Sequence, residues 1–514
     1  MDQLAAHANA TPDKAAVVDD RPGQTPRTLT FAELNSFANR IASGLVERGA
    51  VPGSKLMWCG KNSLELVAFT HAARKLGALA VPLNYRLSDE ETTYVVTNSD
   101  TELVWVDAEF APLFDRIRAE ITNVRDVVVF GGQALDGQVP ADGFLGDDVE
   151  PPEPDVPAGT MIYTSGTTGH PKGAVKTGGA SLEQSKGLLD RLGYEPDDIH
   201  LTCGPLYHSG PGGFARIAHT LGHTLVVQHK FDAEDWLRLL DRYQATSSFS
   251  APTPIRMICD LPVEVKARYD TSSMRVMVAN AAPWSFALKE AYLADFPEES
   301  LWEIYGSTEL GVNCVLAPAD QRRKPGSCGQ PAPDVDVALF TPEGERITEP
   351  DVPGELYVRA SSVLDTYYKA EEKFAADHRE GGWHTVGDIA YVDEEGYYFI
   401  CDRKTDMIIS GGVNIYPAEI EDALERHPGI FEAAVVGVPD DKWGESVLAC
   451  IVRRDGALTT DDVEAHAREH LAGYKVPRQV EFVEEIPKTG SNKILKRTLR
   501  ERFAPSDVAS SKRS

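Results

Sequence analysis

Cysteine is scarce in this sequence, which has 514 residues and only seven cysteines. The seven are scattered, odd in number and nowhere spaced as Cys-x-x-Cys. Neither a disulfide framework nor a structural zinc site is therefore expected.

Long hydrophobic runs are absent as well. No apolar run approaches the ~18 residues of a membrane-spanning helix, and residues 1–20 contain four aspartates and no apolar stretch after a basic cluster. The first absence argues against integral membrane association, and the second argues against a secretion signal. We therefore expect a cytoplasmic protein.

Basic side chains are outnumbered, because 51 Lys and Arg face 79 Asp and Glu, for a formal net charge of −28. Such a charge repels the phosphates of nucleic acids, so no nucleic-acid partner is expected.

What the chain does have is length and apolar content. A hydrophobic share of 42% suffices for a large core, and the length implies more than one domain.

Helical and extended patterns alternate through much of the chain. Thr30 and Glu33 form a capping-box pattern ahead of an amphipathic helix, and another helical pattern opens at Ser88. Short β-branched runs lie between such patterns at residues 80–83, 102–106 and 126–130. This alternation predicts an α/β fold whose large N-terminal domain contains layered, largely parallel sheets and helices. Residues 131–157, rich in Gly, Pro and acidic residues, are interpreted as a solvated connector.

The pattern changes at Asp402. Just before it, residues 391–401 form two extended runs around an Asp-Glu-Glu-Gly turn. After it come a helix, two strands, a second helix and a last strand, which begin near residues 417, 433, 447, 460 and 479. This order predicts a small, mobile C-terminal α+β domain over residues 402–514, behind a large domain over residues 1–401.

The strongest local signal for chemistry is the loop at residues 163–173, Tyr-Thr-Ser-Gly-Thr-Thr-Gly-His-Pro-Lys-Gly. Its glycines let the backbone approach an anion, its hydroxyl and N–H groups can donate to phosphate oxygens, and Lys172 adds a positive charge. It is not a Walker A loop, because Lys172 lies three residues after Gly169 and precedes Gly173. A phosphate cradle is favoured, and a plain surface turn is the alternative.

Further motif blocks follow this loop along the chain. They lie at residues 205–209, 305–309, 385–388, 402–404, 411–414 and 487–496. With the loop, this ordered series resembles the acyl-adenylate-forming superfamily, and in particular its AMP-forming acyl-CoA and aryl-CoA synthetases. One departure is visible in the last block, where Asn492 stands before Lys493 at a position that the superfamily usually gives to glycine.

The resemblance implies catalytic roles for Lys493, His208, Thr308 and Glu309. Lys493 would bridge the carboxylate and the α-phosphate, His208 would lie at the acyl pocket, and Glu309 would also direct Mg²⁺. A larger set would bind ATP or coenzyme A, with Tyr305 at adenine and Asp388 at ribose. That set is Thr164, Ser165, Gly166, Thr167, Thr168, Gly169, Lys172, Tyr305, Asp388, Arg403, Gly411, Gly412 and Trp443.

These residues also have plain structural interpretations. Glu309 could be a solvated carboxylate, and Asp388 could cap a turn. His208 and Tyr305 could be core side chains, and Trp443 is as easily explained by packing. The basic stretch around Lys493 would otherwise be read as a solvated or anion-attracting tail.

The implied reaction is ATP-dependent activation of a fatty, aromatic or alicyclic side-chain acid to an acyl-AMP. Transfer to coenzyme A would then give acyl-CoA, AMP and pyrophosphate, with Mg²⁺ as the metal cofactor. An amide-forming ligase that passes the acyl group to an amine is the close alternative, and a non-catalytic ATP-binding relative is a remote one. The enzyme is expected as a monomer or homodimer.

Three glycines bear on the acid. Gly210, Gly212 and Gly213 follow His208 closely and are expected to leave space around it. This favours a bulky apolar or ring-bearing acid over acetate.

Overall fold

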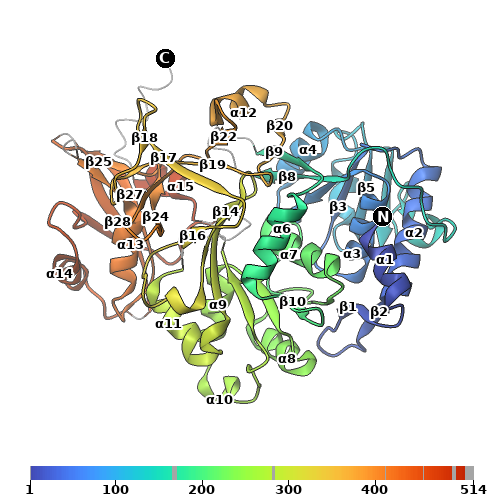
Figure 1. The fold of residues 1–514 in the computed structure, drawn as a ribbon, viewed down its shortest axis with the longest axis horizontal. Coiled ribbons are helices and arrows are strands. Elements are labelled where there is room, and N and C mark those ends of the chain that lie inside the picture. Colours follow the sequence, from blue (N-terminus) through green and yellow to red (C-terminus); the bar gives the residue numbers. More distant parts are fainter. Residues whose placement is uncertain are drawn as a thin grey trace.

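The computed structural model in Figure 1 describes residues 2–164, 171–280, 284–410, 413–440, 442–454, 456–488 and 494–503, without the side chain of Leu182. The chain forms an α/β fold, as the alternating patterns predict. We call the residues up to the end of strand β24 the large part and those from strand β25 onward the small part. Among the described residues, no helix is long and apolar enough to cross a membrane.

The first sheet of the large part runs in the order β20-β9-β8-β4-β3-β5-β6-β7. The pairs from β8·β4 to β6·β7 are parallel, whereas β8·β9 and β20·β9 are antiparallel. Its strands are β3 (Lys55–Cys59), β4 (Leu79–Leu83), β5 (Leu103–Asp107), β6 (Asp126–Phe130), β7 (Val139–Pro140), β8 (Gly159–Thr164), β9 (Lys172–Thr177) and β20 (Thr366–Tyr368). The three β-branched runs thus form β4, β5 and β6, as predicted.

The second sheet runs in the order β16-β15-β14-β13-β12-β10-β11-β1-β2. Every pair from β14 to β1 is parallel. Its strands are β1 (Ala15–Asp19), β2 (Arg27–Thr30), β10 (Ile199–Thr202), β11 (Thr224–Val227), β12 (Ser247–Ser250), β13 (Val276–Ala279), β14 (Leu301–Ser307), β15 (Gly311–Leu316) and β16 (Gln330–Pro331). Because these strands are parallel, the loops after β10, β12, β13 and β14 leave the sheet at one edge.

The third sheet is antiparallel. Its strands are β17 (Asp336–Phe340), β18 (Arg346–Ile347), β19 (Gly354–Arg359), β21 (His378–Arg379), β22 (Trp383–His384), β23 (Asp388–Val392) and β24 (Tyr398–Arg403). β23 and β24 form the predicted hairpin, and in its turn the Asp393 carboxylate accepts from Glu395 N at 3.0 Å and from Tyr397 N at 2.9 Å.

The small part lies at the end of the molecule opposite strands β3 and β5 of the first sheet (Figure 1). Its elements are β25 (Ile408–Ser410), β26 (Val413–Ile415), α13 (Pro417–Glu425), β27 (Ile430–Asp440), β28 (Gly444–Arg453), α14 (Thr460–His470), β29 (Gln479–Phe482) and α15 (Lys496–Phe503). The helix, two strands, helix and strand predicted after Asp402 are all present. β27 and β28 pair antiparallel, and β29 pairs parallel with β28.

Helices cover the sheets of the large part. They are α1 (Gln3–Ala10), α2 (Phe31–Glu47), α3 (Leu64–Lys75), α4 (Asp89–Asn98), α5 (Ala111–Arg116), α6 (Leu182–Leu192), α7 (Ser209–Thr220), α8 (Ala233–Tyr243), α9 (Pro252–Cys259), α10 (Val263–Lys266), α11 (Phe286–Asp295) and α12 (Glu371–Asp377). The capping box of α2 is confirmed, since Thr30 Oγ1 accepts from Glu33 N at 3.2 Å and Glu33 Oε2 accepts from Thr30 N at 2.8 Å.

Most of residues 131–157 are exposed, as expected of a solvated connector, but Phe144 departs from this expectation. Phe144 is buried, with 3% of its surface exposed, and its ring packs 5.9 Å from that of Trp105. Two acidic residues of the segment also have partners, because Asp148 accepts from Asn39 at 3.1 Å and Glu150 pairs with the buried Lys75. The composition gave no signal for these contacts, because the partners of Asp148 and Glu150 lie on helices α2 and α3, far away in sequence.

Buried histidines link α3, α7 and the second sheet. His71 Nε2 lies 2.8 Å from His219 Nδ1, His219 Nε2 lies 2.9 Å from the Ala16 carbonyl, and His200 bonds to Ser247. Burial disfavours the charged imidazole and lowers the pKa of His219 to about 4 and that of His200 to about 3. These rings are therefore neutral in the folded protein.

This burial predicts a loss of stability in acid. Each buried neutral ring contributes fully to the free energy of unfolding above the unfolded pKa of about 6.5. This contribution decreases as the pH falls toward the pKa of the ring in the folded protein. For His219 the loss between pH 7 and pH 5 should be about 2 kcal/mol. Denaturant unfolding of the wild type and of His219→Gln at both pH values would test this. An equal loss in the two proteins would contradict the assignment to His219.

Candidate functional site

Several motif residues lie where strands of the large part end. Thr164 ends β8, His208 precedes α7, and Thr308 and Glu309 follow β14. Parallel strands and the helices that follow them place such residues at the edge where α/β proteins build their sites.

The centre of the candidate site is a cluster of Tyr305, Asp388 and Arg403. Tyr305 donates its hydroxyl proton to Asp388 Oδ2 at 2.5 Å, and Arg403 Nε lies 3.4 Å from Asp388 Oδ1. Asp388 and Arg403 are register partners at the open end of the β23–β24 hairpin. Asp388 is buried, whereas the Arg403 side chain is about half exposed. The cluster thus presents a guanidinium to solvent beside a buried carboxylate.

Burial and charge shift the pKa values in this cluster. Burial, and then the charge of Asp388, raise the pKa of Tyr305 well above its usual value, so its hydroxyl stays a proton donor. Burial alone would lower the pKa of Arg403, but the carboxylates of Asp388 and Glu309 together raise it. Glu309 is therefore close enough to act electrostatically on the same cation.

A hydrogen bond joins two further motif blocks. Ser209 Oγ and Thr308 Oγ1 are 2.8 Å apart, which fixes the start of α7 against the loop after β14. His208 precedes this helix, and its ring packs 4.3 Å from the ring of the buried Tyr207. The structure thus brings His208, Thr308 and Glu309 to one region. The role of Ser209 as the partner of Thr308 was not foreseen, although it lies within the quoted block at residues 205–209.

The phosphate-cradle prediction falls mostly outside the described residues. Ser165, Gly166, Thr167, Thr168 and Gly169 lie there. Thr164 and Lys172, which flank them, are direct partners in the antiparallel pair β8·β9. The chain therefore leaves the first sheet at Thr164 and returns to it at Lys172.

Three other predicted residues, Gly411, Gly412 and Lys493, also lie outside the described residues. Trp443 belongs to the small part, where its backbone N–H donates to Asp440 Oδ1 at 2.9 Å. Two cations lie over its ring, the Arg478 guanidinium at 4.6 Å and the Lys442 ammonium at 4.8 Å. The Trp443 ring thus lies beside two basic side chains.

The basic C-terminal stretch is not simply a solvated tail. The Lys496 side chain is only 12% exposed and contacts Glu421 at 2.9 Å and Asp402 at 3.7 Å. Asp402 is itself buried, and its carboxylate accepts from Ala418 N at 3.1 Å. Spacing alone gives no signal for these contacts, because Asp402, Glu421 and Lys496 are far apart in sequence.

The expectation that three glycines leave space beside His208 was wrong for two of them. A Cβ on Gly210 would lie 2.3 Å from the Phe249 ring, and one on Gly212 would lie 2.3 Å from the Leu206 carbonyl oxygen. Only at Gly213 is the position open. Gly210 and Gly212 therefore allow close packing, and Phe249 fills the space that a side chain at Gly210 would need.

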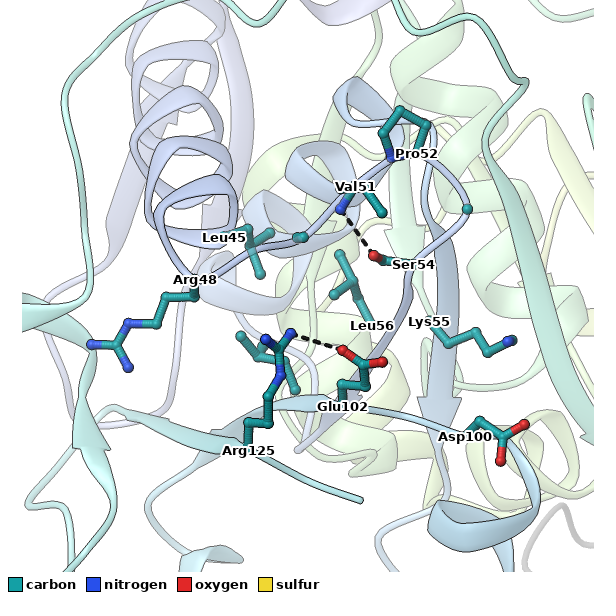
Figure 2. Close-up of a pocket in the computed structure, with 13 residues that line it drawn as sticks. Leu45, Arg48, Val51, Pro52, Ser54, Lys55, Leu56, Asp100, Glu102 and Arg125 are labelled. Atoms are coloured by element: carbon teal, nitrogen blue, oxygen red, sulfur yellow. Dashed lines mark hydrogen bonds and ion pairs between the residues drawn. The ribbon is translucent and has the colours of Figure 1, made fainter. Parts of the chain in front are cut away.

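A pocket of about 290 Å³ lies away from the cluster, where α2 ends and β3 and β5 begin (Figure 2). Two of its charged residues, Arg125 and Glu102, are paired at 2.8 Å. It contains none of the motif residues. Because the chemistry-bearing side chains gather elsewhere, this pocket is not the candidate active site.

Comparisons with known proteins agree with the motif series. The family model described as AMP-binding enzyme matches residues 4–368, and the AMP-binding enzyme C-terminal domain matches residues 419–493. A feruloyl-CoA synthase of Amycolatopsis sp is 36% identical over 96% of this chain and 97% of its own.

Two solved structures resemble this one over nearly their whole lengths. The o-succinylbenzoate CoA synthetase of Bacillus subtilis, in complex with its acyl-adenylate intermediate, has a TM-score of 0.83 and 28% identity over 97% of this chain and 98% of its own. The amide bond synthetase McbA of Marinactinospora thermotolerans has a TM-score of 0.85 and 26% identity over 98% of this chain and 100% of its own.

Proposed function

Since the chain belongs to the family of AMP-binding enzymes, we propose that it activates a carboxylic acid as its acyl adenylate and transfers the acyl group to coenzyme A. The observation that carries the proposal is the cluster of Tyr305, Asp388 and Arg403, with Glu309 acting on the same cation. Nucleotide binding by this cluster accounts for a buried carboxylate beside a half-exposed guanidinium.

The cluster fits the nucleoside and phosphate of ATP. A carboxylate has about four acceptor sites, and Tyr305 uses one on Asp388. Asp388 therefore retains capacity to accept from two ribose hydroxyls. Arg403, at 3.4 Å from the same carboxylate, would direct its exposed guanidinium at the phosphates.

Glu309 fits a role as the Mg²⁺-directing carboxylate. Hard divalent cations on nucleotide phosphates prefer oxygen ligands, and the backbone of Glu309 is anchored because its carbonyl accepts from Leu364 N at 2.7 Å. Bound Mg²⁺ would neutralise charge on the phosphates. The positive charge of Arg403 lies close enough to interact with this carboxylate.

Adenylate formation joins two anions and expels pyrophosphate, so the protein must supply positioning and positive charge. Arg403 and Lys172 are the described cations that we assign to the phosphates, and Lys493 would bridge the attacking carboxylate and the α-phosphate. Thr308, held by Ser209, would donate to an oxygen at the same centre. The loop at residues 164–169 would hold the outgoing phosphates with its N–H and hydroxyl groups.

Thioester formation then requires a thiol where Lys493 had been. We propose that the domain over residues 402–514 rotates for this step, so that Gly411 and Gly412 line a channel for the pantetheine arm. Trp443, with Arg478 and Lys442 over its ring, would lie near the CoA nucleotide, whose phosphates would be attracted by these cations.

The acceptor distinguishes this proposal from its main alternative. The likeness to an amide bond synthetase supports an amine as a second candidate acceptor. Incubating the enzyme with one acid, ATP and either coenzyme A or a set of amines would separate the two. A thioester as the main product supports the proposal, whereas amide formation without thioester would replace it.

We propose a ring-bearing acid as the substrate. The substrates in the names of the feruloyl-CoA and o-succinylbenzoate CoA enzymes both contain a benzene ring, and the open position at Gly213 leaves room beside α7. We predict that a panel of acids, followed by pyrophosphate release, will show the highest kcat/KM for an aromatic acid. A preference for acetate or propionate would reverse this assignment.

A second prediction concerns the nucleotide. Asp388→Ala should weaken ATP binding by roughly 1.5–3 kcal/mol, as expected for hydrogen bonds to a charged group, and should affect the acid much less. Calorimetric titration would measure both. Asp336→Ala is the matched control, because Asp336 lies in the same sheet but in an exposed pair with Arg359. Unchanged ATP affinity in the Asp388 variant would remove Asp388 from the site.

A third prediction separates the two half-reactions. Lys493→Ala should slow adenylate formation by about two or more orders of magnitude, because a positive charge at the reacting centre is lost. It should still convert a synthetic acyl adenylate with coenzyme A. Lys488→Ala serves as the control, since Lys488 is paired with Glu432 at 2.8 Å. Equal losses in both half-reactions would contradict the proposed role.

The remaining proposals concern location and assembly. The seven cysteines are free in the structure, which suits the reducing cytoplasm that we propose. A monomer or homodimer is proposed, and sedimentation of the purified enzyme would distinguish the two.

A further inference from the structure

A side chain of the large part reaches across to the small part far from the chain connection at β24. Arg256 lies on α9, which begins directly after β12 in the middle of the second sheet. Ile255 and Ile258, its neighbours on the helix, are buried in the core between α8, α9 and α11. α9 is therefore a rigid support, and Arg256 is held in a defined position.

The guanidinium of Arg256 binds two groups of the small part. Nη2 donates to Glu425 Oε2 at 2.9 Å, and Nη1 donates to the backbone carbonyl of Phe431. The guanidinium also lies 5.7 Å from the centre of the Phe431 ring. Glu425 ends α13 and Phe431 is the second residue of β27, so the Arg256 side chain contacts two elements of the small part.

This contact is shielded from water. The side chains of Arg256 and Glu425 are only 19% and 14% exposed. The second oxygen of Glu425 accepts from Ala433 N at 3.3 Å, which orients the carboxylate. Charge-assisted hydrogen bonds of this kind are stronger than exposed ion pairs, and removal of one partner leaves a buried charge without its counterion.

A neighbouring pair is weaker by the same criteria. Arg454 and Asp260 are 3.9 Å apart, with side chains 44% and 45% exposed. Water and salt screen such a pair. Of these two contacts, Arg256 therefore carries most of the electrostatic attachment of the small part to α9.

We propose that Arg256 is a positioning residue that clamps the small part in the orientation seen here, and that this orientation serves adenylate formation. The proposed function underlies the second half of this statement, because it requires the small part to adopt two orientations. In the orientation seen here, Lys496, which follows Lys493 by three residues in the sequence, lies 3.7 Å from Asp402, the neighbour of Arg403. The clamp must then open once per turnover, before thioester formation.

The decisive experiment compares the half-reactions in Arg256→Ala, Glu425→Gln and the double variant. Single-turnover pyrophosphate release should slow by about tenfold in Arg256→Ala, whereas consumption of a preformed adenylate by coenzyme A should not slow. The two substitutions should be strongly non-additive, because they remove the same contact. Arg268→Ala is the matched control, since Arg268 pairs with Glu234 in an exposed contact within the large part.

Hydrogen exchange provides a readout that does not depend on activity. Amides of residues 425–433, including that of Ala433, should exchange faster in Arg256→Ala, while the cores of β27 and β28 keep their protection. Unchanged exchange would overturn the clamp itself. Faster exchange with equal slowing of both half-reactions, or with slowing of the thioester step alone, would overturn its assignment to adenylate formation. If no acid is adenylated by the wild type, the proposed function fails and the exchange result still decides whether the clamp exists.

Discussion

The β23–β24 hairpin is the constraint on which the rest of the site depends. Its two strands place Asp388 and Arg403 opposite each other, so a buried carboxylate and a cation meet without any long-range contact being needed. Neighbouring residues of a strand point to opposite faces. Arg403 therefore faces the candidate nucleotide site, whereas Asp402 faces the small part, where it accepts from Ala418 N and contacts Lys496. One short strand end thus links the nucleotide site to the domain that would move.

The overall charge of the chain makes local cations necessary. At a formal net charge of −28, the molecule as a whole repels ATP, coenzyme A and a carboxylate substrate. Binding therefore depends on cations held at defined positions, such as Arg403 beside Asp388 and Glu309. The acidic neighbours do not cancel this cation. These carboxylates raise the pKa of Arg403, and about half of the Arg403 side chain stays exposed.

Local sequence patterns predicted only part of the elements, namely those whose signals are local. The capping box at Thr30, the hairpin turn at Asp393 and the order of helices and strands after Asp402 depend on residues close in sequence. The motif blocks likewise indicated Tyr305, Asp388 and Arg403, although not that Tyr305 donates to Asp388. That contact joins residues more than eighty positions apart, and no spacing rule predicts it.

The errors have the same physical origin. Gly210 gave no indication that the Phe249 ring would fill the space beside it, and the acidic composition of residues 131–157 gave none that Phe144 would be buried. The structural role of a glycine or of a polar segment depends on the elements that pack against it. The contact of Arg256 could not be predicted for the same reason, because nothing in the sequence of α9 indicates that Glu425 and Phe431 lie beside it.

The free-energy cost of rotating the small part would depend on which residue at the end of β24 or between β24 and β25 acts as the pivot. Asp402 and Arg403 are in register with Ile389 and Asp388, and Lys404 N donates to the Gly387 carbonyl at 2.7 Å. Rotation at Asp402 itself would therefore disrupt the hairpin and separate Arg403 from Asp388. Rotation beyond Lys404 would instead break the side-chain contacts of Asp402 and the hydrogen bonds that Asp406 N and Met407 N donate to the Arg403 carbonyl. Lys496 would not be left unpaired by that change, because it keeps Glu421 at 2.9 Å. For the rotation proposed above, a pivot just after Lys404 would keep the nucleotide site assembled, so Asp402 and Arg403 would stay with the large part.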